Sequence, residues 1–215
     1  MQLVKTFQNI KMYKNNNIIQ LVDEKDKSFF WDLFTLKNNK ISKSIRQDQI
    51  IIEFESNSCV SLSQYLESKQ YLLSYHDAVE CLLDLYEQCK KLTDNNILVP
   101  FFDIEDILVI NNHFYFIQSN KIITREENTQ FILSVPFKKN IFISPEISSG
   151  TLPIKLTFES TLYSLGVLVS YTLTNEEITF QNKEKKLHFI YLTKLYSCIL
   201  RLLEKSVYQR IFLFG

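Results

Sequence analysis

The sequence predicts an α+β fold in which short strands come first and helices follow. Residues 1–55 hold short apolar and aromatic runs separated by polar turns, which favours strands over helices. In residues 75–92 the apolar side chains recur at spacings of three and four, which is typical of an amphipathic helix. Residues 159–174 are apolar on nearly every side, so we expect a helix that is buried all round. Hydrophobic residues make up 46% of the 215 residues, enough for a substantial core.

The first 55 residues contain four predicted strands. They are residues 8–14, 17–23, 28–36 and 49–55. Two segments rich in Asn and Lys, 14–17 and 37–43, are predicted as the turns between them. Serines and one cysteine follow at 56–61, and we expect the boundary between the two parts of the chain there.

Helices and a few further strands are predicted beyond this boundary. A short helix begins after Ser61, which is a good N-cap residue. The other predicted helices are 75–92, 159–174 and 187–205, the last after a polar linker at 175–186. The predicted strands are 97–99, 106–110 and 113–118, the last two joined by a turn at Asn111-Asn112.

Charge and hydropathy argue against nucleic-acid and membrane partners. The 24 basic residues match the 24 acidic ones, so the net charge is 0 and no basic surface is available for phosphates. No apolar run reaches the length of a transmembrane helix, and residues 1–14 lack the apolar centre of a signal peptide. We therefore expect neither nucleic acid nor a membrane as a partner.

The four cysteines show no metal-binding spacing. They are Cys59, Cys81, Cys89 and Cys198, and no CxxC pair occurs among them. We expect free, buried thiols in a reducing compartment, and hence a cytoplasmic protein.

Four stretches between residues 51 and 210 follow one another in a recognisable order. They are IIEFESNSCVSLSQYL at 51–66, Ser-Pro-Glu at 144–146, TLYSLGVLVSYTL at 161–173 and LLEKSVYQR at 202–210. Together they resemble the eukaryotic protein-kinase fold, with Ser-Pro-Glu similar to the Ala-Pro-Glu motif that closes the activation segment. The resemblance implies a two-lobe fold. A reduced, β-rich N-lobe and hinge would occupy residues 1–58, and a mainly helical C-lobe would occupy residues 59–215.

Four residues in these stretches are expected to hold the fold together. The resemblance pairs Glu146 with Arg210, and a bidentate contact between them would tie two distant segments. Pro145 ends the preceding segment because it fixes φ and has no N–H. Gly166 lies in the buried helix, where glycine is tolerable if another element approaches closely. The resemblance thus makes all four residues structural.

Phosphotransfer needs a phosphate cradle, a lysine, metal-binding carboxylates and a base. The only glycines are at 150, 166 and 215, so no Gly-rich loop exists within residues 1–149. The resemblance further implies degenerate positions in the catalytic loop and the magnesium-binding motif. Phe101 stands for the base aspartate, Asp103 for the lysine, Asp106 for the metal-binding asparagine, and Gln118 for the magnesium-binding aspartate.

By the same resemblance, two further positions differ from the kinase pattern. Pro100 replaces the arginine that reads a phosphorylated loop, and Thr161 replaces the aspartate that supports the catalytic loop. We expect that this support is no longer needed.

The nucleotide lysine is harder to place. Lys37 is one candidate, and a solvated surface lysine is the alternative interpretation. A second alignment places residues 15–26 before the fourth kinase strand, which would delete the cradle and the lysine together. Either alignment removes the phosphate site.

Two further sets of polar residues are candidates for metal binding. Asp103, Glu105 and Asp106 could bind magnesium, or form a solvated acidic turn. His76, His113 and His188 lie far apart in sequence, so we expect surface or capping roles for them.

The leading functional hypothesis is a catalytically inactive kinase-like domain that acts as a protein-binding scaffold or regulator. It would need no cofactor or metal, and its partner would be a protein such as an active kinase or a large assembly. The aromatic stretches 29–34 and 208–215 are candidate contact surfaces, the first alternatively part of the core. One alternative is a residual nucleotide-binding protein or phosphotransferase that uses displaced carboxylates. Another is a structural subunit of a larger assembly.

Overall fold

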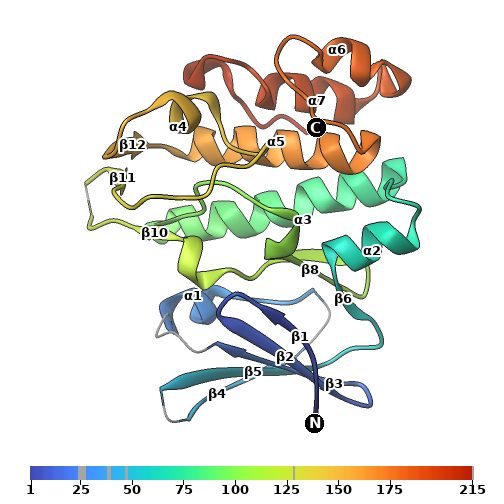
Figure 1. Cartoon of the computed structure of the whole chain (residues 1–215), viewed down its shortest axis with the longest axis vertical. Coiled ribbons are helices and arrows are strands. Elements are labelled where there is room, and N and C mark those ends of the chain that lie inside the picture. Colours follow the sequence, from blue (N-terminus) through green and yellow to red (C-terminus); the bar gives the residue numbers. More distant parts are fainter. Residues whose placement is uncertain (24–27, 38–39, 47, 128, 215) are drawn as a thin grey trace.

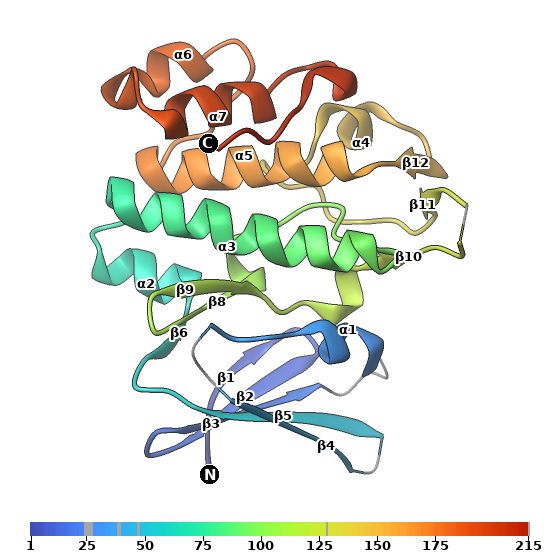
Figure 2. The same ribbon diagram turned by 180° about the vertical axis from the view of Figure 1, so that it is seen from behind.

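A five-stranded antiparallel sheet at one end of the molecule and a stack of helices at the other give the chain an α+β fold (Figure 1). The computed structural model describes residues 1–23, 28–37, 40–46, 48–127 and 129–214. A small three-stranded sheet lies between the two ends (Figures 1 and 2). The predicted class, with strands first and helices later, is therefore confirmed.

The five-stranded sheet is built from the first 55 residues. Its strands are β1 (Gln2–Phe7), β2 (Ile10–Asn15), β3 (Ile18–Asp23), β4 (Ile41–Arg46) and β5 (Gln49–Glu55), in the order β1-β2-β3-β5-β4. Along β5, Ile50, Ile52 and Phe54 are buried while the residues between them are not, which is the alternation expected of a strand with one buried face. The predicted strands 8–14, 17–23 and 49–55 correspond to β2, β3 and β5.

The prediction of a strand at 28–36 was wrong. The structure has helix α1 (Ser28–Leu33), which turns Phe30 and Trp31 into the core, and Phe34 follows just beyond its end. The Trp31 ring lies 5.1 Å from both the Phe30 and the Phe34 ring centroids. A run of aromatic residues fits a buried strand or a buried helix equally well, so its composition alone did not decide between them. The candidate contact surface at 29–34 is thus mainly core.

Two strands were missed in the same region. The segment 37–43 was predicted as a turn, yet residues 41–46 form the edge strand β4. Its side chains are exposed or only half-buried, so it lacks the apolar alternation that reveals a strand. The first strand, β1, is also an edge strand and is mostly exposed.

The helical part contains two long helices packed side by side. Its helices are α2 (Leu62–Ser68), α3 (Tyr75–Asp94), α4 (Pro145–Ser149), α5 (Phe158–Thr174), α6 (Lys183–Lys186) and α7 (Lys194–Leu202). In both views α5 lies between α3 and α7 (Figures 1 and 2). That position explains why α5 is buried nearly all round, as predicted. Ser61 caps α2 as expected, and its partner in the capping box is Gln64.

Short strands connect these helices. β6 (Cys59–Ser61), β8 (Ile107–Ile110) and β9 (His113–Phe116) form the three-stranded sheet. β7 (Ile97–Leu98) pairs with β10 (Ile123–Thr124), and β11 (Phe131–Leu133) pairs with β12 (Ile154–Leu156). Asn111 and Asn112 have φ values of 49° and 66° in the β8–β9 turn, a conformation that asparagine tolerates well.

The predicted C-terminal helix 187–205 is interrupted. A short 3-10 turn covers His188–Ile190, and α7 begins only at Lys194. Leu192 has φ of 67°, which a continuous helix does not allow. Thr193 then starts α7, because its side chain accepts a hydrogen bond from the Tyr196 N–H.

The four cysteines are free and buried, as expected. Burial raises the pKa of the Cys198 thiol to about 11, so this thiol is held in its neutral form. Within the part of the chain that the structure describes, no helix combines the length and apolarity needed to cross a membrane.

Candidate functional site

A cleft of about 600 Å³ lies against the loop at residues 99–106, where a catalytic loop was predicted. Thr6, Phe7 and Gln8 of the β1–β2 hairpin line the cleft on the sheet side. The remaining lining residues come from the 99–106 loop and from residues 118–123 and 133–140. The cleft thus brings together segments more than one hundred residues apart in sequence.

The 99–106 loop is anchored on the buried helix α5. Thr161 Oγ1 donates a hydrogen bond to the Val99 carbonyl. One turn further along α5, Ser164 Oγ accepts a hydrogen bond of 2.8 Å from the Phe102 N–H. The expectation that Thr161 has nothing to support was therefore wrong, because a hydroxyl at this position still holds the loop backbone.

Two of the carboxylates in this loop are paired with lysines. Asp106 is fully buried, and both of its carboxylate oxygens lie 2.7 Å from Lys121 Nζ. Glu105 lies 2.9 Å from Lys5 Nζ. Among the described residues, Asp103, Glu105 and Asp106 do not form a group close enough to hold one metal ion. The structure therefore does not support a magnesium site here, and the alternative of a solvated turn was wrong for Asp106, which is buried.

The Asp106 carboxyl gives the fold a measurable pH dependence. Burial raises its pKa to about 6, although the Lys121 ammonium opposes the rise. Between pH 4 and 6 the folded protein therefore holds a proton that the unfolded chain releases, and stability should fall as the pH rises through this window. Asp106→Asn should flatten this part of the curve of melting temperature against pH.

Asp94→Asn provides the control for that comparison. Asp94 is exposed and pairs with Lys90, one turn earlier on α3, so its replacement should leave the fall in stability between pH 4 and 6 unchanged. If Asp106→Asn still lost stability between pH 4 and 6 as the wild type does, this pH dependence would not come from Asp106.

The other predicted degenerate positions also lie at the cleft. Phe101 lines it and packs against Phe137, with 5.4 Å between the ring centroids. Gln118 is only 1% exposed, and its Oε1 has no hydrogen-bond partner among the residues that the structure describes. Ser119, the next residue, points away toward the sheet and donates a hydrogen bond to Asp23. The structure thus gathers Phe101, Asp103, Asp106 and Gln118 around one cavity.

Lys37 does not lie in this cleft. It follows α1 rather than sitting within a strand, and its Nζ is 2.6 Å from an Asp84 oxygen. The interpretation of Lys37 as a nucleotide lysine is therefore not supported. The second alignment is not supported either, because the β1–β2 hairpin precedes β3 in the same sheet. The last residues of that alignment, 24–26, lie outside the described residues.

The predicted pair of Glu146 and Arg210 is present. Arg210 donates from its two terminal nitrogens to the two Glu146 oxygens, at 2.7 and 2.9 Å. Ser160 Oγ adds a third hydrogen bond, of 2.7 Å, to Glu146. The Arg210 guanidinium also lies 4.7 Å from the centre of the Tyr163 ring. The pair therefore ties α4, α5 and the C-terminal segment together.

Pro145 and Gly166 occupy the positions expected of structural residues. Pro145 is the first residue of α4, where its missing N–H costs nothing. A methyl group at Gly166 would lie 2.8 Å from the Leu202 Cβ on α7. The close approach of α5 and α7 explains why glycine stands there.

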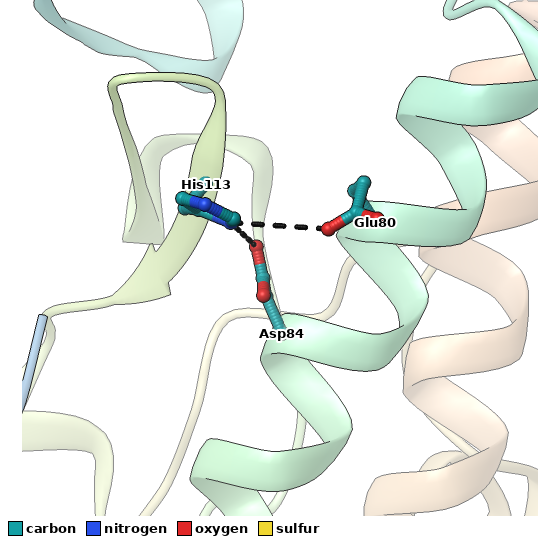
Figure 3. A group of neighbouring side chains, drawn as sticks. All are labelled: Glu80, Asp84 and His113. Carbon is teal, nitrogen blue, oxygen red and sulfur yellow. Dashed lines mark hydrogen bonds and ion pairs between the residues drawn. The ribbon is translucent and has the colours of Figure 1, made fainter. Parts of the chain in front are cut away.

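A second polar group lies where α3 faces the start of β9 (Figure 3). Glu80 and Asp84 project from one face of α3 toward His113 at the start of β9, and their ligand atoms lie within 4.8 Å of one another. The sequence shows no metal-binding spacing for these residues. Its only signal is the separation of four between Glu80 and Asp84, which places them on one face of a helix.

The comparisons with known proteins add no relative. No protein-family model matches the chain, and the search of curated proteins likewise found no match.

Proposed function

We propose that this chain is a kinase-like domain that has lost phosphotransfer and acts as a protein-binding module. The observation that carries the proposal is the state of the 99–106 loop. Its backbone is held on α5 by Thr161 and Ser164, while the carboxylates of Glu105 and Asp106 are occupied by lysines. The loop that the kinase-like interpretation makes the catalytic loop thus has a well-supported backbone, while two of its three carboxylates are already paired with lysines.

The arrangement of the elements supports the kinase-like part of the proposal. A five-stranded antiparallel sheet has a helix after its third strand, and a buried central helix lies in the helical part. The bidentate pair between Glu146 and Arg210 adds a specific long-range contact that the resemblance implied. These features favour a two-lobe arrangement with the cleft between the lobes.

The charged groups that line the cleft do not form a phosphotransfer site of the usual kind. A transferred phosphate needs a metal ion and a nearby cation to neutralise developing charge. Two lysines line the described part of the cleft, Lys121 and Lys138, and the Lys121 ammonium is already 2.7 Å from Asp106. Phe101 at the position of the base is apolar and cannot accept a proton. The chemistry of the lining residues therefore favours binding over catalysis.

The C-terminal segment offers a surface for a protein partner. Phe212 stacks on Tyr86 of α3 with 3.5 Å between ring centroids, which fixes the segment against the fold. Its neighbours Ile211 and Leu213 are 51% and 53% exposed, and Tyr208 is 94% exposed. A rigid backbone that presents apolar and aromatic side chains outward is typical of an interaction surface. The neutral net charge favours a protein over a polyanion as the partner.

Thermal unfolding with millimolar ATP and magnesium tests the loss of chemistry. A ligand at one hundred times its Kd stabilises the native state by about 2.7 kcal/mol, equivalent to about 5–10 °C for a chain of this length. We expect no shift. A magnesium-dependent shift would contradict the proposal and favour the alternative of a residual nucleotide-binding protein.

The binding role is tested with the C-terminal surface. The triple variant Tyr208→Ser, Ile211→Ser and Leu213→Ser should keep the fold, because these side chains are exposed, and should lose partners that the wild type retains in a pull-down. Ile45→Ser is a matched control, since Ile45 is 62% exposed on the distant edge strand β4. If the wild type, the triple variant and Ile45→Ser captured the same partners, the C-terminal segment would not be the binding surface. An isolated chain that stays insoluble would favour the structural-subunit alternative.

A further inference from the structure

Glu80, Asp84 and His113 form one hydrogen bond and one longer contact, and both distances are close to the spacing of ligand atoms around a metal ion. His113 Nδ1 is 3.0 Å from Asp84 Oδ2 and 3.8 Å from Glu80 Oε2. The second distance is too long for a hydrogen bond. Ligand atoms bound at about 2.0–2.1 Å around a tetrahedral zinc ion lie about 3.3 Å apart. Small side-chain rotations would therefore bring all three atoms onto one ion (Figure 3).

The central carboxylate is already held in place. The Asp84 side chain is 2% exposed, and its Oδ2 accepts a hydrogen bond of 2.9 Å from the Phe114 N–H. Its other oxygen lies 2.6 Å from Lys37 Nζ. Contacts of this kind orient a metal-ligating carboxylate. Glu80 and His113 are 30% and 24% exposed, so the ion could enter from solvent on their side.

The local charge favours a cation. Three carboxylates gather here, from Glu80, Asp84 and Glu87, whereas Lys37 and Lys91 supply two positive charges. One negative charge remains when His113 is neutral. Lys37 is 41% exposed and has a flexible side chain, so its ammonium can move outward as a cation binds.

We propose that Glu80, Asp84 and His113 form a binding site for a transition-metal dication of the zinc class. One imidazole nitrogen and two carboxylate oxygens are a donor set that suits zinc, whereas calcium and magnesium prefer oxygen donors alone. Three protein ligands leave a fourth position for water or for a group from a partner. The bound ion would fasten α3 to β9. This inference does not rest on the proposed function, since none of the three residues lines the cleft.

Cobalt(II) is the probe for the site, because its visible absorption reports coordination geometry and ligand exchange. The full chain, kept reduced, should bind one equivalent and show a tetrahedral or five-coordinate spectrum. Zinc should displace the cobalt and raise the melting temperature by about 5–10 °C at one hundred times its Kd.

Three variants decide whether the cluster is responsible. Glu80→Gln and His113→Gln should each abolish the spectrum and the zinc-induced shift. Glu80 is partly exposed, so Glu80→Gln should melt like the wild type in the presence of EDTA. Glu87→Gln is the matched control, because Glu87 lies on the same helix beside Lys37 but outside the three ligands, and it should still bind.

Two outcomes would overturn the site. In the first, the wild-type chain shows no stoichiometric binding of cobalt or zinc at micromolar concentrations, and His113 then serves only as a hydrogen-bond partner of Asp84. In the second, Glu80→Gln and His113→Gln bind as tightly as the wild type, which would place the ion elsewhere, for example on His76 or His188.

Discussion

Replacing Glu146 with alanine is expected to destabilise the protein by about 2–4 kcal/mol. The Arg210 side chain is fully buried in the structure, with 0% exposure, and Glu146 supplies its neutralising charge. The variant would leave a buried guanidinium with the carbonyls of Glu159, Glu204 and Lys205 and the Tyr163 ring, but without a neutralising charge from Glu146. An unpaired buried charge costs more than the pair contributes, which is why we expect so large a loss.

Chemical denaturation of three variants would measure this effect. Glu146→Gln keeps hydrogen-bond acceptance but loses the charge, so it should fall between the wild type and Glu146→Ala. Glu159→Ala is the control, because Arg210 uses only the Glu159 backbone carbonyl. A loss below about 0.5 kcal/mol in Glu146→Ala would contradict a structural role for the pair, since surface ion pairs have effects of that size.

The pair of Glu146 and Arg210 should also affect how the stability of the protein changes at acid pH. Burial tends to raise the pKa of the Glu146 carboxyl, but the hydrogen bonds from Arg210 and Ser160 outweigh it and hold the pKa below its ordinary value of 4.5. This contribution is present above pH 4.5 and is lost as the pH falls through the lowered pKa. Asp106 acts in the opposite direction between pH 4 and 6. Glu146→Ala and Asp106→Asn should therefore alter different parts of the curve of stability against pH.

Regular patterns in the sequence identified much of the fold. The alternation in β5 and the stripe along α3 each repeat with a period that only one secondary structure satisfies, and the apolar run of α5 is too long for a strand. The errors fall where no such period exists. The aromatic run at the start of α1 is buried in either conformation, and the exposed edge strand β4 buries too little to show alternation.

The two polar constellations differ in how far the sequence predicted them. Glu146 and Arg210 are 64 residues apart, and only the resemblance to a known fold suggested that they meet. Glu80, Asp84 and His113 had no such precedent. Their meeting depends on how the β8–β9 hairpin packs on α3, and local sequence carries no record of that packing. Long-range polar contacts of this kind follow from tertiary structure alone.

Replacing Asp23 with alanine is the substitution for which we expect the largest effect, about 3–5 kcal/mol. Asp23 is fully buried at the end of β3 and accepts hydrogen bonds from Asn9 Nδ2 at 2.6 Å and Trp31 Nε1 at 2.7 Å. Ser119 Oγ donates a third, at 2.5 Å. Alanine would leave three buried donors without this acceptor, and each unsatisfied group costs about 1–3 kcal/mol.

A matched control lies nearby on α1. Asp32 is exposed and pairs with Lys43 at the surface, so Asp32→Ala should change stability by less than about 1 kcal/mol. Asp23→Asn keeps one acceptor oxygen and should fall between the two. If Asp23→Ala cost less than about 1 kcal/mol, the three donors would have to find other partners, and the central role of Asp23 would be contradicted.

The way in which Asp23→Ala unfolds also tests the division of the chain at residue 58. The bond from Ser119 to Asp23 crosses that boundary, and one continuous core contains Ile19 and Ile52 of the sheet together with Phe116 and Leu165 of the helical part. A shared core couples the two parts, so the variant should melt in a single transition at a lower temperature. Hydrogen exchange would then show α5 and β5 losing protection together. Early exchange in β1–β5 alone, with α3 and α5 still protected, would instead mean that residues 1–58 unfold as an independent unit.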